Sequence, residues 1–240
     1  MFKSVLGWLQ IGAWILPSPS DIFSRDHARA CNGDSIARVE LARLVEQYKV
    51  HGVVETGTFK GYTTWFLASL STMPIVHSIE ADTKTFLAAK AKLWNARNIR
   101  LHLGNSGKVL GDLLDRLPKQ TALFYLDAHW NSYWPLADEL NAIVRFRGNR
   151  DIIVIDDFHV PAQDWQYDSY SGCENDLETL KSMLDIDRYH YYFPRESRRR
   201  INGKQKKGVG QIYLIPKSVD GPCFFQTETE TPLSNLVANE

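Results

Sequence analysis

Residues 51–68 read HGVVETGTFKGYTTWFLA. The opening HGVVE is short and β-branched, which predicts a buried strand, and the apolar residues after Gly61 predict a helix. Gly57 and Gly61 lie at the turn between them, where glycine lets a ligand approach the backbone closely. Three residues separate these glycines rather than one, so this is not the GxGxxG dinucleotide pattern. The acidic Glu55 ahead of them favours a cationic or hydroxyl-bearing ligand over a pyrophosphate.

The rest of the chain repeats this strand-and-helix unit. Strands are expected at 51–55, 74–80, 98–104, 122–127 and 151–157, and helices at about 61–71, 83–96, 107–117, 134–146 and 173–186. Asp34 is placed to cap an additional helix ahead of the first strand. This alternation predicts an α/β fold with a parallel sheet and helices on both faces. Two further strand-like segments, 188–194 and 208–216, are expected to form an antiparallel C-terminal hairpin at one edge of the sheet.

The expected parallel strands end in polar residues. Four of the five end in an acid or a pair of acids, and the third runs into small polar residues; the residues concerned are Glu55, Glu80, Asn105, Ser106, Asp127, Asp156 and Asp157. Ligands of open parallel sheets bind outside the carboxyl ends of the strands, so these side chains are expected to share one site. Glu80 follows Glu55 by 25 residues, a spacing at which an acid can bind both ribose hydroxyls.

These residues together resemble the class I S-adenosylmethionine-dependent methyltransferases. The run 55–68 is similar to motif I in the E-x-G-x-x-x-G-Y-[ST] form of the metal-dependent O-methyltransferases, which include the catechol, caffeoyl-CoA, macrolide-sugar and aminocoumarin enzymes. LDAHW (126–130) and IDDFH (155–159) follow in the same order, and the resemblance covers about residues 35–216. It implies a Rossmann-like methyltransferase fold with a mostly parallel seven-stranded sheet. It also implies O-methyl transfer to a hydroxyl of a small acceptor. A sugar-containing molecule and an anionic molecule are the two kinds of acceptor we consider.

The resemblance also implies roles for the matching residues. Glu55, Gly57, Thr58 and Gly61 would line the methionine end of S-adenosylmethionine, together with Asp127. Glu80 would hold the ribose, and Asn105 and Ser106 would lie near the adenine. Asp127, Asp156 and Asp157 match the family's metal ligands, and three hard oxygen donors suit Mg²⁺ or a similar divalent cation. A purely structural role for the three aspartates stays open.

The general base departs from the family pattern. The catechol and caffeoyl-CoA enzymes carry a lysine three residues after the first aspartate, where this chain has Trp130. His129 stands where some sugar methyltransferases carry an acidic base, and a neutral imidazole accepts a proton near pH 7. We therefore expect His129 to be the catalytic base, with His159 as the second candidate. A supporting hydrogen-bonding role for His129 is the alternative.

Composition excludes some classes of protein. The 240 residues carry 28 basic and 28 acidic side chains, and 44% are hydrophobic, which argues against a disordered chain and a generally basic nucleic-acid binder. An N-P-P-Y-like motif for amino-nitrogen methylation is also lacking. Cys31, Cys173 and Cys223 form no CxxC pair, which favours a reducing compartment, so we expect a cytoplasmic protein with no nucleic-acid partner.

Two segments lie outside this scheme. Residues 1–20 hold an apolar run followed by a Pro-Ser linker, the domain is expected at 21–218, and a tail follows at 219–240. The apolar run at 1–16 is too short to span a bilayer, and it leaves open a helix packed on the domain or on a second subunit, peripheral membrane binding or a degenerate signal peptide. Residues 195–207 contain seven basic side chains and one acidic side chain. This basic loop is expected either to act as a lid over an anionic acceptor or to be a solvated tip.

Two other functions compete with O-methyl transfer. Asp127, His129 and His159 are the residue types of a two-histidine, one-carboxylate iron site, and some hydroxylases share the methyltransferase-like scaffold. The chain could instead be a non-catalytic cofactor-binding domain that docks through its apolar N-terminus and its basic loop. Iron-dependent turnover would favour the first, and tight cofactor binding without a metal site would favour the second.

Overall fold

A seven-stranded sheet forms the centre of the molecule. The computed structural model describes residues 26–129, 133–170 and 172–219. The sheet has the order β3-β2-β1-β4-β5-β11-β8. Its strands are β1 (Gly52–Thr56), β2 (Ile75–Glu80), β3 (Ile99–Leu103), β4 (Ala122–Leu126), β5 (Ile152–Ile155), β8 (Tyr189–Tyr192) and β11 (Ile212–Pro216). The first five pair in parallel, whereas β11 runs antiparallel to both of its neighbours. The expected parallel sheet and its antiparallel C-terminal pair are both confirmed.

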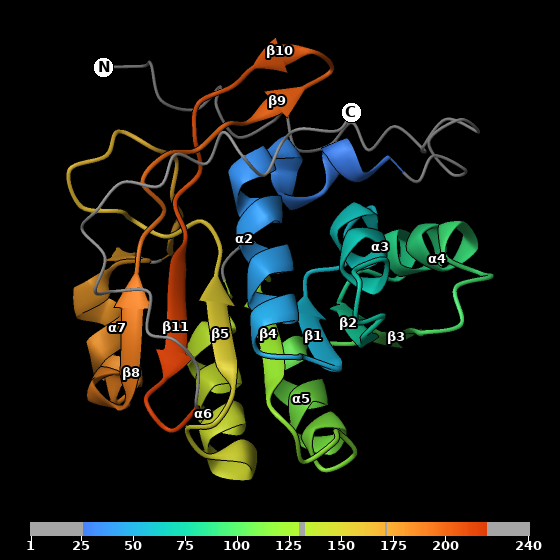
Figure 1. Ribbon diagram of the computed structural model, residues 1–240, viewed down its shortest axis with the longest axis horizontal. Coiled ribbons are helices and arrows are strands. Elements are labelled where there is room, and N and C mark those ends of the chain that lie inside the picture. The colour runs from blue at the N-terminus through green and yellow to red at the C-terminus, as the bar shows by residue number, and fades with distance from the viewer. Residues whose placement is uncertain (1–25, 130–132, 171, 220–240) are drawn as a thin grey trace, which may run out of the picture.

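Helices cover both faces of this sheet (Figure 1). On one face lie α5 (Ser106–Leu114), α6 (Leu136–Arg147) and α7 (Leu177–Met183). The other face carries α2 (Ser35–Gln47), α3 (Tyr62–Ala68) and α4 (Thr83–Lys92). Successive strand residues point to opposite faces, so Val54 of β1 packs in the first core and Val53 in the second. Every residue of the central strands β1, β4 and β5 is buried, and this explains why these strands are predominantly apolar on both faces.

Aspartates fix where several helices begin. The carboxylate of Asp34 accepts hydrogen bonds from the backbone N–H groups of Ile36 and Ala37 and caps α2, as predicted. Asp82 caps α4 in the same way. The helix expected at 173–186 is shorter than predicted, since α7 starts at Leu177 after the cap residue Asp176. Residues Cys173–Glu174 form the short strand β7, paired with β6 (Ser169–Tyr170).

The basic loop folds into a small hairpin of its own. β9 (Arg200–Ile201) pairs with β10 (Lys204–Gln205) and lies beyond the carboxyl ends of the parallel strands, beside the start of α2 (Figure 1). Two short 3-10 turns, His27–Arg29 and Cys31–Gly33, precede α2, and a third, Ile186–Arg188, precedes β8. Within the described part of the chain, no helix is long and apolar enough to cross a membrane. Residues 1–20 lie outside the described residues, and so does the tail after residue 219.

Candidate active site

The site lies at the point where the order of the sheet reverses. The chain runs from β1 outward to β3 and then returns to β4, on the other side of β1. Gly57 directly follows β1 and adopts φ +86°, in the left-handed region. A Cβ atom there would lie 2.4 Å from the main-chain oxygen of Asp127, which follows β4. Gly61 precedes α3 at φ +69°, and its Cβ would meet the Leu93 side chain at 2.9 Å. Both positions therefore require glycine.

Glu55 supports the turn after β1 from below. It is buried, and its Oε2 accepts hydrogen bonds from the hydroxyls of Thr64 and Ser78. The Ser78 hydroxyl also lies 2.6 Å from that of Thr58, which ties the turn to β2. Burial raises the pKa of Glu55 to about 7, against the lowering effect of these two hydroxyls. Contact of Glu55 and Thr58 with a cofactor remains a prediction.

Glu80 ends β2 beside the same turn. Its two carboxylate oxygens accept hydrogen bonds from the backbone N–H groups of Phe59, at 2.8 Å, and Asp82, at 2.9 Å. The residue is 7% exposed, and burial raises the pKa of its carboxyl group. Glu80 thus holds the loop between Gly57 and Gly61 against β2. Each oxygen can accept more than one hydrogen bond, so this arrangement is compatible with the predicted ribose contact.

Asn105 and Ser106 stand at the start of α5. Asn105 is the residue before the first helical position, and its Oδ1 is buried without a hydrogen-bond partner among the described residues. Ser106 is buried and bonds to the side chain of Glu139 on α6. The unpartnered Asn105 oxygen fits a ligand that brings an N–H donor, such as an adenine amino group. The adenine contact itself remains a prediction.

Glu139 is a site residue that the sequence analysis missed. Its carboxyl group is buried and bonds to Ser106 and to Thr56 at the end of β1, while its Oε1 has no partner among the described residues. Burial raises the pKa of Glu139 to about 7. A signal was present in the sequence, because Glu139 lies on the helical stripe formed by Leu136, Leu140 and Ile143. A lone acid within such a stripe predicts a buried carboxyl group.

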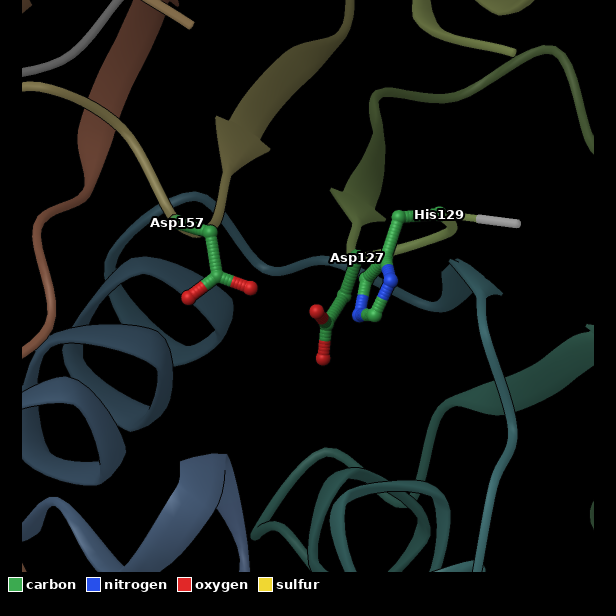
Figure 2. Close-up of side chains that lie close together, drawn as sticks. All are labelled: Asp127, His129 and Asp157. Atoms are coloured by element: carbon green, nitrogen blue, oxygen red, sulfur yellow. The ribbon is translucent and has the colours of Figure 1, made fainter. Parts of the chain in front are cut away.

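Three side chains converge as a candidate metal centre. Donor atoms of Asp127, His129 and Asp157 all lie within 4.8 Å of one another, and Figure 2 shows them facing one space from the ends of β4 and β5. Burial raises the pKa of Asp127 and Asp157, and neighbouring carboxylates raise it further. Two carboxylates with this mutual repulsion and an imidazole are donors that fit a divalent cation.

Asp156, the third expected ligand, lines the same pocket as these side chains but is not one of the three residues whose donor atoms lie within 4.8 Å of one another. Asp156 is buried, and its oxygens accept hydrogen bonds from Tyr125, at 2.7 Å, and from Gln211, at 2.6 Å. Asp156 and Asp157 directly follow β5, and Asp157 adopts a left-handed φ of +50°, so the two side chains leave the backbone in different directions. Of the pair, Asp157 is the one whose carboxylate lies within 4.8 Å of donor atoms of Asp127 and His129, and a contact of Asp156 with the cation remains a prediction.

His159 also lies apart from this group. Its Nδ1 is 3.2 Å from a carboxylate oxygen of Glu174, and its ring stacks on Tyr167 with a centroid distance of 4.3 Å. Together with Glu174 and Asp176 it forms a second cluster of potential metal ligands. The expected second base is therefore engaged elsewhere, and the combination of Asp127, His129 and His159 required for an iron site does not assemble.

A pocket opens between the ends of β4 and β5, beside the candidate metal centre. Its walls include two aromatic residues, Trp134 and Tyr170, whose rings stack 5.4 Å apart. The Tyr170 ring also lies 6.3 Å from that of His129, and its hydroxyl donates to Asp168. The other polar side chains of the wall are those of Asp127, Glu139, Asp156, Asp157, Asp168 and Asn175. Trp130, which replaces the family's lysine, lies outside the described residues.

The basic loop is bound to the body of the molecule near this site. The Arg198 backbone N–H and the Ser197 hydroxyl donate to Asp34, the residue that caps α2. Arg199 donates to the carbonyl of Asn32 at 2.9 Å and to Gln166 at 2.6 Å. The Arg199 guanidinium lowers the pKa of Asp157, although less than burial and neighbouring carboxylates raise it. The root of the loop is thus anchored, whereas residues 202–207 at its tip are exposed, and both expected roles of the loop remain predictions.

The chain has the fold of S-adenosylmethionine-dependent O-methyltransferases. No protein-family model and no curated protein matches it. Among solved structures, it is similar to a Klebsiella pneumoniae protein assigned as an O-methyltransferase, with a TM-score of 0.56 and 18% identity over 86% of this chain and 94% of that one. A Staphylococcus aureus protein assigned as a caffeoyl-CoA O-methyltransferase is similar with a TM-score of 0.51 and 13% identity, over 76% of this chain and 84% of that one. A third similar structure is TomG of Streptomyces achromogenes, an O-methyltransferase involved in tomaymycin synthesis and solved with S-adenosylmethionine. Its TM-score is 0.52 at 17% identity, over 75% of this chain and 79% of that one. These matches confirm the expected fold class.

Proposed function

We propose that this protein is an S-adenosylmethionine-dependent, divalent-cation-assisted O-methyltransferase that acts on a hydroxyl group of a small molecule. The observation that carries the proposal is the convergence of Asp127, His129 and Asp157 beside the glycine turn that follows β1, where Gly57 contacts the main chain of Asp127. A cofactor bound at that turn would face the candidate metal centre. The turn and the three side chains all follow strands of the sheet at its carboxyl edge, where ligands of such sheets bind, and this supports the proposal.

The cofactor side of the site consists of residues that bind and orient. The turn at Gly57 and Gly61 admits a ligand against the backbone, and Glu80 stands at the end of β2 to accept ribose hydroxyls. The unpartnered Oδ1 of Asn105 supports an adenine contact. When bound, S-adenosylmethionine supplies an electrophilic methyl group.

On the acceptor side, residues hold the substrate and remove its proton. A divalent cation held by Asp127 and Asp157 makes an acceptor hydroxyl more acidic. His129 faces the same space, and we assign its imidazole the role of accepting that proton. Trp134 and Tyr170 form a flat wall that excludes water and suits a ring-shaped acceptor. A ring nitrogen that binds the cation cannot also accept a proton, and we assign His129 as the base rather than as a ligand. His129→Gln should therefore reduce turnover far more than cation affinity.

The proposal is tested in two steps. Calorimetry with S-adenosylhomocysteine on the full chain first establishes cofactor binding. Methyl transfer from labelled S-adenosylmethionine is then measured against a panel of catechols, sugars and glycosylated compounds, with Mg²⁺ or Mn²⁺ and with EDTA. Transfer that is lost in EDTA and restored by the cation supports the function. Absence of cofactor binding would reject it, and binding without transfer to any acceptor would favour the non-catalytic docking domain.

A further inference from the structure

Asn175 lies just before the start of α7 and is hydrogen-bonded to the segment that follows β5. Its side-chain Nδ2 donates hydrogen bonds to the main-chain oxygens of Asp156 and Asp157, both at 3.0 Å. Its own backbone N–H donates to Asp168, and its carbonyl accepts from His159. Two carbonyl acceptors can be served only by the NH₂ end of the amide, so the orientation of the side chain is determined. The amide oxygen, Oδ1, therefore points away from this backbone.

That oxygen is buried without a partner. Asn175 is 3% exposed, and its Oδ1 accepts no hydrogen bond from any residue that the structure describes. The side chain lines the same pocket as Asp127, His129 and Asp157. An unsatisfied buried acceptor costs about 1–3 kcal/mol, so a group that satisfies it is expected.

The side chains around Asn175 Oδ1 indicate that its missing partner is a cation. Asp127, Asp157 and Asp168 line the pocket as well, and their carboxylates are acceptors like the amide oxygen. The Tyr170 hydroxyl, a donor in this wall, is already committed to Asp168. A water molecule has two protons to share among these oxygens, whereas a cation satisfies several of them at once.

We propose that Asn175 Oδ1 is an oxygen ligand of the divalent cation, in company with Asp127 and Asp157. This inference rests on the cation site of the proposed function. It adds a residue that directly precedes the cap of α7 to the aspartates that the sequence resemblance implied; Asp156 lines the same pocket, and its oxygens accept hydrogen bonds from Tyr125 and Gln211. Three oxygen donors from three separate segments suit Mg²⁺ or Mn²⁺. They also leave the His129 imidazole available to accept a proton.

The test measures Mn²⁺ binding to the full chain by electron paramagnetic resonance and calorimetry, and the number of inner-sphere waters by water-proton relaxation. Asn175→Ala should weaken Mn²⁺ binding about tenfold or more and add one inner-sphere water. Asn175→Asp keeps an oxygen at the ligand position but loses the Nδ2 donor, and it should bind Mn²⁺ at least ten times more tightly than Asn175→Ala. Asn149→Ala, whose Oδ1 serves Tyr189 away from the pocket, is the matched control and should bind as the wild type does.

A ligand role of Asn175 Oδ1 and a purely backbone-holding role of Nδ2 predict different orders of Mn²⁺ affinity among these variants. If the residue acts only by holding the backbone through Nδ2, both substitutions lose Mn²⁺ equally, and the inference is overturned. Unchanged affinity and water number in Asn175→Ala overturn it as well, while the cation site of the proposed function survives. A wild type that binds S-adenosylhomocysteine but neither Mn²⁺ nor Mg²⁺ rejects the cation site and this ligand together. Should Asn175→Ala fail to fold, Asn175→Asp decides alone, since tenfold weaker binding than the wild type contradicts a ligand role.

Discussion

Gly57 faces the main-chain oxygen of Asp127 so closely that a Cβ atom would come within 2.4 Å of it. The Asp127 N–H in turn donates to the carbonyl of Thr56, the last residue of β1. The turn expected to bind the cofactor and Asp127, a proposed cation ligand, are therefore in direct backbone contact. A displacement of one displaces the other.

Gly57→Ala should disrupt both halves of the site. The left-handed backbone alone costs an L-residue about 1–2 kcal/mol, and the clash is with backbone rather than with a movable side chain. We expect a loss of stability above that figure, measured by urea unfolding, and a large loss of S-adenosylhomocysteine affinity. Gly203→Ala is the matched control, since its φ is +75° and nothing lies within 4 Å of its Cβ. Equal effects of the two substitutions would show that the contact with Asp127 does not matter.

The neighbours Asp156 and Asp157 should behave differently. Asp157→Asn weakens a donor of the cation site, so the thermal stabilisation that Mg²⁺ or Mn²⁺ gives the wild type should shrink or vanish. Asp156→Asn alters a buried network with Tyr125 and Gln211, so it should lower the melting temperature without cation and leave the cation-induced shift intact. Thermal scans with EDTA and with Mn²⁺ separate the two. A lost Mn²⁺ shift in Asp156→Asn would restore that residue to the ligand set.

Strand periodicity accounts for what the sequence could predict here. The alternation of short β-branched segments with helices was enough for the sheet and its two covered faces, and Asp34 was identifiable as a cap from local residues. Which of the two adjacent aspartates approaches Asp127 and His129 depends on the left-handed backbone at Asp157 and on Asn175, which contacts it from 18 residues away. The contact of His159 with Glu174 likewise joins separate segments of the chain, since Glu174 belongs to β7. Such long-range contacts leave no local pattern.

Glu139 should make the stability of the protein depend on pH. Its folded pKa of about 7 exceeds the usual value near 4.5, so the folded state holds the proton more tightly and loses stability as pH rises from about 4.5 to 7. Glu139→Gln removes this loss, and its stability relative to the wild type should be higher at pH 8 than at pH 5 by about 3 kcal/mol at most. Urea unfolding in EDTA measures it. The same stability difference between Glu139→Gln and the wild type at both pH values would contradict the raised pKa of Glu139.

Glu80 should contribute directly to cofactor affinity. Glu80→Ala removes the acceptor for ribose hydroxyls and should weaken S-adenosylhomocysteine binding by about 1.5–3 kcal/mol, the range for hydrogen bonds to a charged group. The same change frees the backbone N–H groups of Phe59 and Asp82, so Asp82→Ala, which removes the neighbouring helix cap instead, controls for loosening of this segment. Calorimetry on both variants gives the comparison. Equal losses would assign Glu80 a structural role in the turn.

The outer half of the basic loop should govern the charge preference of the acceptor. Arg200, Lys204 and Lys206 are exposed on the β9–β10 hairpin, whereas Ser197, Arg198 and Arg199 anchor its root. Replacing the outer three with alanine therefore leaves the anchoring contacts in place while removing three positive charges near the carboxyl edge. If the acceptor is anionic, this triple variant should raise its KM and flatten the dependence of KM on salt, because exposed charges act through a screened field.

The comparison uses a catechol and its carboxylate-bearing analogue, or the equivalent pair for whichever acceptor class is turned over. The variant should lose discrimination in favour of the anionic member, with kcat for the neutral member and affinity for S-adenosylhomocysteine unchanged. A KM that stays the same for both members at low and high salt would limit these three side chains to solubility. The acidic pocket wall makes the test decisive, since Asp127, Asp157 and Asp168 repel an anion unless a cation or the basic loop offsets them.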